Sequence, residues 1–121
     1  MDKVEFTEEL LSRTKSFALR IIKLFQALPK SGEAQVIGKQ ILRCGTSVAA
    51  NYRAACRSRS KAEFFSKLCN VVEETDETLF WIELLIESKI VTEKKLAALQ
   101  KETTELLSIF AKARKTLSKT R

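Results

Sequence analysis

Apolar residues recur along most of the chain at steps of three and four, the spacing that places side chains on one face of an α-helix. Four such stretches are separated by short polar segments. The stripe of the first stretch is Leu10, Thr14, Phe17, Ile21, Leu24 and Leu28. The stripe of the third is Phe64, Leu68, Val71, Thr75, Leu79, Ile82 and Ile86. The most regular apolar seam lies in the last stretch, at Leu96, Leu99, Thr103, Leu106, Phe110, Ala113 and Leu117. The pattern predicts four helices, at about residues 7–28, 32–57, 61–88 and 92–117.

Polar residues at the ends of these stretches support the same division. Thr7 precedes two glutamates and is expected to cap the first helix. Pro29–Gly32 separates the first two helices, Ser60 and Glu63 form a capping box, and Thr92 precedes the fourth helix. Because such short connections force neighbours to run antiparallel, we predict an all-α protein: one domain, residues 1–121, folded as an antiparallel up-down-up-down four-helix bundle.

The second predicted helix carries two ridges. Its apolar ridge includes Asn51, which either fixes register or partner choice or bonds to a neighbouring backbone group. Its other ridge consists of small residues: Gly38, Gly45, Ala49 and Cys56. Because Gly in a helix costs roughly 1 kcal/mol relative to Ala, we expect this ridge to admit a close neighbour. That neighbour is either another helix of the same chain or a second subunit.

The three cysteines are expected to be reduced. Cys44 and Cys56 lie on the same predicted helix, roughly 18 Å apart at the rise of an α-helix, which is too far for a disulfide. Cys69 lies on the next helix, and no Cys-x-x-Cys pair occurs. We therefore expect three thiols that act as small core residues.

Charge is strongly segregated along the 121 residues, whose net charge is +7. From Arg13 to Lys67 there are twelve basic and two acidic residues, whereas residues 68–105 contain nine acidic and four basic ones. Three explanations remain open. The basic half binds nucleic acid, or it meets the acidic half of a neighbouring subunit, or it is a solvated face. The second explanation would generate a head-to-tail ring.

The first explanation, binding of RNA or DNA, has eight candidate residues: Arg13, Arg20, Lys39, Arg43, Arg53, Arg57, Arg59 and Lys61. Tyr52 and Trp81 are the only Tyr and Trp, and the seven Phe mostly fall on core stripes, so the sequence offers no evident platform for base stacking. Binding is therefore expected to involve mainly the phosphate backbone and to be weakly sequence-specific.

A subunit contact has its own candidates, drawn from the small ridge, its neighbours and the acidic third helix: Gly38, Gly45, Ala49, Asn51, Tyr52, Glu73, Glu77 and Trp81. Trp81 is expected to be a core or interface anchor with its indole N–H near water, or else an anchor for a partner protein. The acidic residues of this helix form either an exposed face or half of the subunit contact.

The residue types present argue against most catalytic and metal sites. Glu73, Glu74, Asp76 and Glu77 suggest a di-metal bundle, but that chemistry uses His as well as carboxylates, and the chain has no His. There is also no Gly-rich phosphate loop. We expect no cofactor, no metal and no enzymatic activity. No apolar run approaches the roughly 20 residues of a membrane span, and the N-terminus lacks a signal-peptide pattern, so a cytoplasmic location is expected.

Four short motifs carry a family resemblance: Gly45-Thr46-Ser47, Asn51-Tyr52-Arg53, Ser60-Lys61 followed by Phe64, and Glu77-Thr78 leading to Trp81. From about Phe6 to about Lys115 the chain resembles the bacterial four-helix-bundle family named after proteins encoded in intervening sequences of 23S rRNA genes. The resemblance implies an up-down bundle that assembles into a homopentamer. The family's biochemical role is not settled, and nucleic-acid binding is suspected.

A related bundle is the accessory protein of diversity-generating retroelements, which works beside a reverse transcriptase; this chain matches that branch less well. The sequence thus predicts a non-enzymatic, cytoplasmic, oligomeric bundle that binds RNA or DNA through a basic face. The alternative is a protein–protein scaffold or accessory subunit that docks a partner enzyme.

Overall fold

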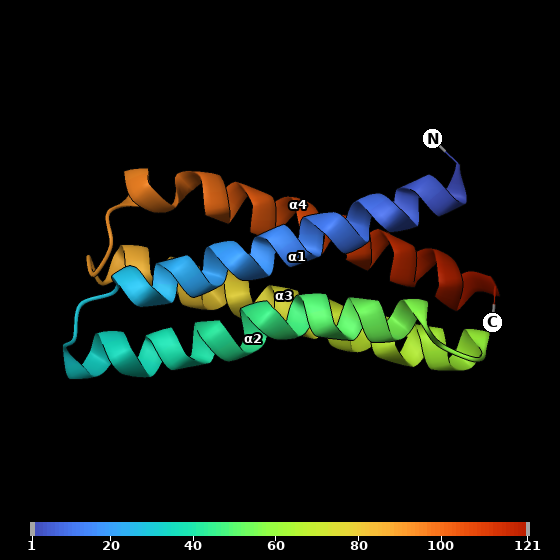
Figure 1. The fold of residues 1–121 in the computed structure, drawn as a ribbon, viewed down its shortest axis with the longest axis horizontal. Coiled ribbons are helices and arrows are strands. Elements are labelled where there is room, and N and C mark those ends of the chain that lie inside the picture. The colour runs from blue at the N-terminus through green and yellow to red at the C-terminus, as the bar shows by residue number, and fades with distance from the viewer. Residues whose placement is uncertain (1, 121) are drawn as a thin grey trace.

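A computed structural model describes residues 2–120 and contains four long helices in that range (Figure 1). They are α1 (Lys3–Ala27), α2 (Gly32–Cys56), α3 (Lys61–Glu87) and α4 (Glu93–Thr120). Each helix runs opposite to the one before it, and the start of α1, the α2–α3 connection and the end of α4 share one end of the molecule (Figure 1). The predicted all-α four-helix bundle is confirmed.

The first helix begins four residues earlier than the sequence reading placed it, so the start at Thr7 was wrong. Asp2 is the N-cap residue, and its side chain accepts a hydrogen bond from the Glu5 amide at 2.9 Å. The Thr7 hydroxyl instead donates to the Lys3 carbonyl within the helix at 2.9 Å. The extra turn adds Lys3 and Phe6 to the end of the bundle where α2 and α3 connect.

The other helix ends lie close to their predicted positions. Ser60 caps α3, because its hydroxyl accepts from the Glu63 amide at 3.1 Å. Ser31 occupies the N-cap position of α2, but its side chain makes no capping hydrogen bond. The last helix continues to Thr120, three residues beyond the predicted end.

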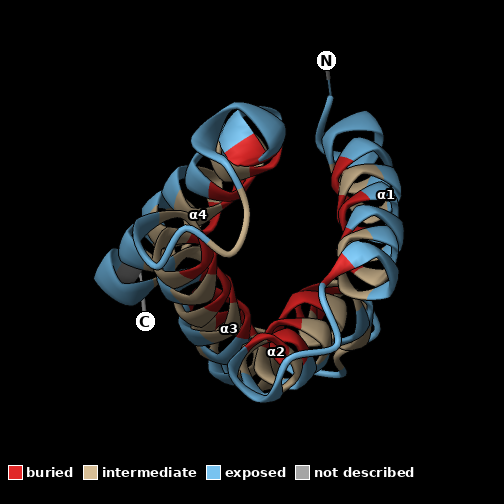
Figure 2. Cartoon of the chain, turned by 90° about the vertical axis from the view of Figure 1, so that its left-hand side faces the viewer, coloured by how far each residue is buried: buried red, intermediate tan, exposed pale blue. Residues whose placement is uncertain are grey.

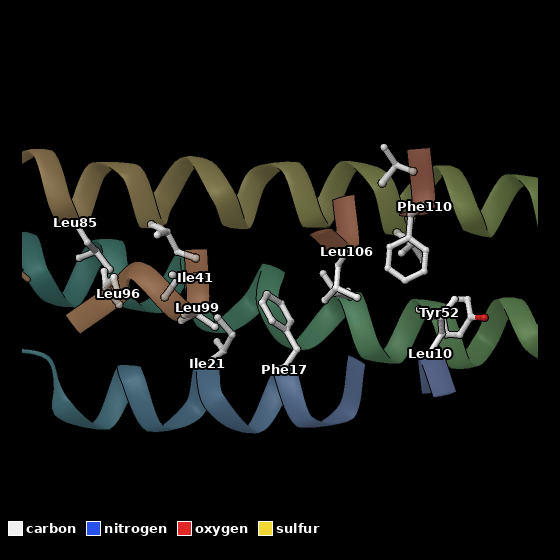
Figure 3. Close-up of a cluster of buried hydrophobic side chains, with 14 of the residues drawn as sticks. Leu10, Phe17, Ile21, Ile41, Tyr52, Leu85, Leu96, Leu99, Leu106 and Phe110 are labelled. Atoms are coloured by element: carbon white, nitrogen blue, oxygen red, sulfur yellow. The ribbon is translucent and has the colours of Figure 1, made fainter. Parts of the chain in front are cut away.

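The buried residues of all four helices face a common interior (Figure 2). Figure 3 shows part of this core, in which the Tyr52 and Phe110 rings lie 5.2 Å apart between centroids. The predicted stripes of α1 and α4 are largely buried. On α3 the sequence pattern predicted that Leu79 and Ile86 face the core. The structure instead buries their neighbours Thr78 and Leu85. On α2, Tyr52 is buried whereas Asn51 is only half-buried.

Four threonines are buried in this core, and each satisfies its hydroxyl within its own helix. Thr14, Thr75, Thr78 and Thr103 donate to the carbonyl four residues earlier, at 2.7 to 2.9 Å. A buried hydroxyl with a hydrogen-bond partner avoids most of the cost of leaving water. These residues therefore occupy apolar seams without an unsatisfied polar group.

Two of the three glycines of α2, Gly38 and Gly45, lie against α1 and its C-cap residue. A Cβ at Gly45 would come within 2.8 Å of Cγ1 of Ile21, and one at Gly38 within 2.7 Å of Cδ1 of Leu28. Real Cβ atoms essentially never lie that close to another atom, so a Cβ at either position would force the Ile21 or Leu28 side chain to shift. The sequence allowed the close neighbour of the small ridge to be either another helix of the same chain or a second subunit. At Gly38 and Gly45 it is a helix of the same chain.

Among neighbouring helices, α1 and α4 approach each other least (Figure 2). The bundle is therefore most open along this side, and grooves lie between α1 and α4 at both ends of the molecule. Within the described residues, no helix has an apolar stretch long enough to cross a membrane.

Candidate nucleic-acid interface

Arg13, one of the predicted binding residues, forms ion pairs with carboxylates of α4. Its guanidinium donates to Glu102 through Nε (3.1 Å) and Nη2 (2.6 Å), and Nη2 also reaches Glu105 at 3.1 Å. The hydrogen bond to Glu102 raises the pKa of Arg13 above its ordinary value, although partial burial opposes that effect. With Nε and Nη2 engaged by carboxylates, Arg13 joins α1 to α4 and is poorly placed to bind phosphate.

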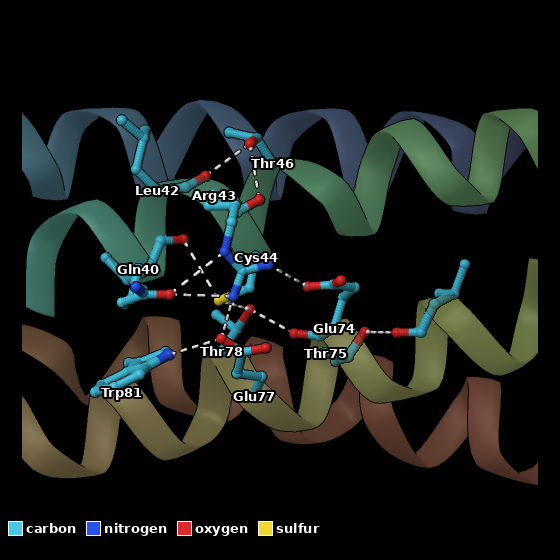
Figure 4. Close-up of polar contacts among 12 residues, drawn as sticks. Gln40, Leu42, Arg43, Cys44, Thr46, Glu74, Thr75, Glu77, Thr78 and Trp81 are labelled. Carbon is cyan, nitrogen blue, oxygen red and sulfur yellow. Dashed lines mark hydrogen bonds and ion pairs between the residues drawn. The ribbon is translucent and has the colours of Figure 1, made fainter.

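Arg43 likewise forms ion pairs with carboxylates of α3 (Figure 4). It donates to Glu74 at 3.3 Å and to Glu77, and Gln40 of its own helix accepts from it at 3.2 Å. The Trp81 indole N–H donates to the same Glu77 carboxylate at 3.0 Å. Glu77 and Trp81, predicted at a subunit contact, thus belong to a network within the chain.

A basic cluster remains at the α2–α3 connection. It consists of Arg53, Arg57, Arg59 and Lys61, all of them exposed, and is called the basic end below. Arg59 has a side chain that is 92% exposed and lies 3.9 Å from Glu63. The other three have no ion pair among the residues that the structure describes. The basic end therefore holds cations that are free to bind an external anion.

The eight predicted binding residues do not form one surface. Arg20 and Lys39 are exposed, but they lie nearer to the opposite end of the bundle, and Arg20 lines a groove there of about 530 Å³ between α1 and α4. Together with the occupied Arg13 and Arg43, this leaves only the four residues of the basic end side by side. These four are close in the sequence, at the end of α2, the start of α3 and the connection between them, so their proximity depends on local structure alone.

A second groove, of about 1030 Å³, adjoins the basic end and is called the end groove below. All four helices line it: Lys3 and Phe6 of α1, Tyr52 and Cys56 of α2, Lys61 and Phe64 of α3, and Lys112, Ala113 and Leu117 of α4. Arg59 of the basic end also lines it. Sequence reasoning missed the α1 contribution because it started that helix at Thr7; the spacing of Asp2 and Glu5 was the available signal.

The titratable groups in the floor of the end groove stay neutral at physiological pH. Burial raises the pKa of the Tyr52 hydroxyl and of the Cys56 thiol, and nearby Glu8 raises that of Cys56 further. No carboxylate lines the groove among residues 2–120. Its charge therefore comes from Lys3, Arg59 and the two other lysines of its lining, and is positive.

The remaining subunit-contact candidates are divided between the core and the surface. Gly38, Gly45 and Tyr52 are buried within the chain, so they are corrected to core positions that cannot meet a second subunit as the fold stands. Ala49 and Asn51 are half-buried, and of the eight candidates only Glu73 is exposed.

A possible contact that the sequence reading did not identify lies beside Glu73 on α3. Phe80 is 50% exposed there, its ring lies edge-on to Trp81 at 5.1 Å between centroids, and Asp76 is exposed one turn before it. An exposed aromatic side chain among carboxylates is suited to a basic, partly apolar partner surface.

Cys44 is a buried thiol whose pKa is raised strongly above its ordinary value. Its sulfur is fully buried, lies 3.2 Å from the Thr78 hydroxyl oxygen, and donates a weak hydrogen bond to the Ile41 carbonyl at 3.7 Å. Burial raises its pKa to about 11, so it is protonated and a weak nucleophile at neutral pH. None of the three cysteines is in a disulfide.

Within the described residues, no cluster of His, Cys, Asp or Glu is arranged to hold a metal ion.

The chain is similar to proteins of one family. The family model described as 23S rRNA-intervening sequence protein matches residues 8–112. A crystal structure of a protein with unknown function, from the S23 ribosomal protein family of Bacteroides thetaiotaomicron VPI-5482, has a TM-score of 0.83 and 33% sequence identity to it. The match covers 90% of this chain and 97% of that one. No curated protein matches the chain.

Proposed function

This chain belongs to the 23S rRNA-intervening sequence protein family, and from that premise we propose that it is a non-enzymatic, cytoplasmic module that binds RNA or DNA through its basic end. The observation that carries the proposal is the contrast between engaged and free arginines. Arg13 and Arg43 are held by carboxylates, whereas Arg53 and Arg57 are exposed and have no ion pair in the described chain.

Free cations at one end of the bundle suit the phosphate backbone of a nucleic acid. Each phosphate that a Lys or Arg neutralises releases condensed counterions, and this release supplies most of the affinity of sequence-independent binding. An arginine already paired with two carboxylates contributes little, because the phosphate would have to displace them. The proposed interaction is therefore with backbone, weakly sequence-specific and strongly dependent on salt.

The test compares two triple charge reversals that lower the net charge equally. One changes Arg53, Arg57 and Arg59 to Glu; the matched control changes the exposed α4 residues Lys94, Lys95 and Lys101 to Glu. Binding of labelled RNA and DNA to purified protein is measured by fluorescence anisotropy at low and near-physiological salt.

We expect the basic-end triple variant to lose binding and the α4 variant to keep most of it. Equal losses would mean that overall charge, rather than the basic end, is responsible. No binding by the wild-type protein to any nucleic acid would refute the proposal. Because the protein is purified, a result that depends on another protein is excluded by design.

A second candidate function, a scaffold or accessory subunit, is favoured by the outer face of α3. Glu73, Asp76, Phe80, Glu83 and Glu87 follow one another at steps of three and four, and Phe80 is half exposed among them. Such a face suits a basic partner, including the basic end of another copy in a head-to-tail ring.

The family resemblance would make that ring a homopentamer. Light scattering coupled to size exclusion, on wild type and Phe80→Lys, tests this second candidate. A ring that Phe80→Lys dissociates supports self-assembly through α3. A wild-type monomer at near-physiological salt argues against assembly, and an intact ring in Phe80→Lys assigns the contact to another face.

A further inference from the structure

We propose that the end groove accepts an unpaired base of a single-stranded nucleic acid, while the basic end holds the adjoining phosphates. This inference rests on the proposed nucleic-acid binding and specifies its substrate as single-stranded rather than duplex. It also departs from the expectation, drawn from the sequence, that the chain has no platform for base stacking.

The aromatic lining of the end groove provides that platform. Phe6 lines the groove and is 46% exposed, although it is a large apolar side chain on a regular helix. Phe64 lines it from α3 and packs against the core. A base placed on Phe6 would remove its ring from water, and stacking of this kind tolerates every base because each has a π-face. The groove volume of about 1030 Å³ is ample for one base with its sugar.

The Ser60 hydroxyl in the same lining supplies an adaptable hydrogen bond. The Thr7 hydroxyl is already engaged, because it donates to the Lys3 carbonyl and is hydrogen-bonded to the Tyr52 side chain. The Ser60 hydroxyl accepts from the Glu63 amide and so keeps its hydrogen to donate. Every base carries acceptor atoms on its edges, so this one free donor can meet any of them. The lining therefore suits base binding without strong sequence preference.

The charges around the groove are arranged for a strand that enters it from the basic end. Lys3 of α1, Lys61 of α3 and Lys112 of α4 line the groove with Arg59, and no carboxylate lines it in the part of the chain that the structure describes. Phosphates on either side of an inserted base would then lie near cations. In a duplex the bases are paired and stacked, so a duplex can use the basic end but not the end groove.

The test measures binding of a labelled single-stranded oligouridylate and of a duplex RNA of equal length, at the same salt, by fluorescence anisotropy. Variants are Phe6→Ala, the rescue variant Phe6→Tyr, and Leu19→Ala, a control on α1 whose side chain is 56% exposed and does not line the groove. Thermal unfolding of each variant verifies that the bundle is intact.

We expect Phe6→Ala to weaken single-strand binding by at least about fivefold, since stacking on one aromatic residue is worth about 5- to 150-fold in affinity. Duplex binding should change by less than about twofold, Phe6→Tyr should retain binding, and Leu19→Ala should change neither. In Phe6→Trp, insertion of a base should also quench the new indole emission.

Two outcomes would overturn the inference while leaving the proposed function intact: single-strand binding that Phe6→Ala does not weaken, or equal weakening of single-strand and duplex binding. Phe6-dependent capture of an acidic amphipathic peptide without Phe6-dependent RNA binding would make the groove a protein-docking site and also overturn it. Absence of all RNA binding by the wild type would instead refute the proposed function.

Discussion

Arg13 of α1 and Glu102 of α4 are joined by two hydrogen bonds, from Nε to Oε2 at 3.1 Å and from Nη2 to Oε1 at 2.6 Å. They lie on the side of the bundle where the helices approach each other least. Both side chains are partly buried, so water screens them less than it screens a surface pair. This pair therefore closes a side of the bundle that has little other packing, and its arginine acts in stability rather than in binding.

Arg13→Gln is expected to lower the free energy of unfolding by about 1 kcal/mol, whereas the same change at Arg53 should stay within about 0.5 kcal/mol. The difference arises because loss of the Arg13 guanidinium leaves the partly buried Glu102 carboxylate without its partner, whereas Arg53 is exposed with no ion pair in the described chain. Urea denaturation of the two variants measures it. Equal effects would mean that the Arg13 network contributes nothing to stability.

Much of the fold followed from periodicity, because the apolar seams have few alternatives at helical spacing. The start of α1 did not follow, since both Asp2 and Thr7 have side chains that can cap a helix and the choice between them depends on what the first turn contacts. The sequence also did not show that Thr78, rather than its neighbour Leu79, faces the core on α3. A threonine hydroxyl that bonds back to its own helix is compatible with the core, so polarity alone does not exclude it.

The site was less predictable because charge along a sequence does not show which cations are already paired. In the sequence, nothing distinguishes Arg13 and Arg43 from Arg53. Only the folded structure shows that Glu102 pairs with Arg13 and that Glu77 pairs with Arg43. The end groove likewise combines residues from all four helices and has no local signature in the sequence.

Gly45→Ala is expected to destabilise the protein by about 1 kcal/mol, although Ala is the better helix former by roughly the same amount. The new methyl group would lie 2.8 Å from Cγ1 of Ile21, a fully buried side chain, and overpacking of this kind costs about 1–3 kcal/mol. Denaturant unfolding gives the value.

Gly32→Ala is the matched control for that experiment, because nothing lies within 4 Å of the position that its Cβ would occupy. It should be neutral or slightly stabilising. In a double-mutant cycle, Ile21→Ala should relieve part of the Gly45→Ala cost. If Gly45→Ala stabilises the protein as much as Gly32→Ala does, α1 does not pack on α2 as closely as described.

Stability is expected to fall as the pH rises above about 9, partly because of Cys44. Burial raises the pKa of its thiol from 9.0 to about 11, so the folded protein keeps a proton that the unfolded chain loses. The stabilisation is fully present below pH 9 and is lost between about 9 and 11, and it amounts to at most about 2.7 kcal/mol. Burial also raises the pKa values of Tyr52 and Cys56, which act in the same direction.

Urea unfolding of wild type and Cys44→Ala at about pH 8 and about pH 10.5 isolates the Cys44 contribution. The variant should start less stable because it loses a buried side chain, but its stability should fall less steeply with pH. The decisive quantity is therefore the difference between the two pH values, not the stability at either one. Identical losses in both proteins would contradict a buried, protonated Cys44.

The salt dependence of duplex RNA binding should separate the free cations from the paired ones. The slope of log K against log salt changes by about 0.9 for each phosphate contact to a duplex. Arg57→Ala and Lys61→Ala should each reduce the slope by up to about that amount, because both residues belong to the basic end and have no ion pair in the described chain. Arg43→Ala should leave it unchanged, since Glu74 and Glu77 already neutralise that guanidinium.

The Arg43 variant makes this experiment discriminating, because it removes the same charge as Arg57→Ala does. If affinity depended only on net charge, the two variants would show equal slopes. If Arg43 left its carboxylates to bind phosphate, its variant would lose slope as well, and the contrast between engaged and free arginines would no longer support a binding site at the basic end. A slope that changes only for Arg57 and Lys61 would place phosphate contacts at the α2–α3 connection.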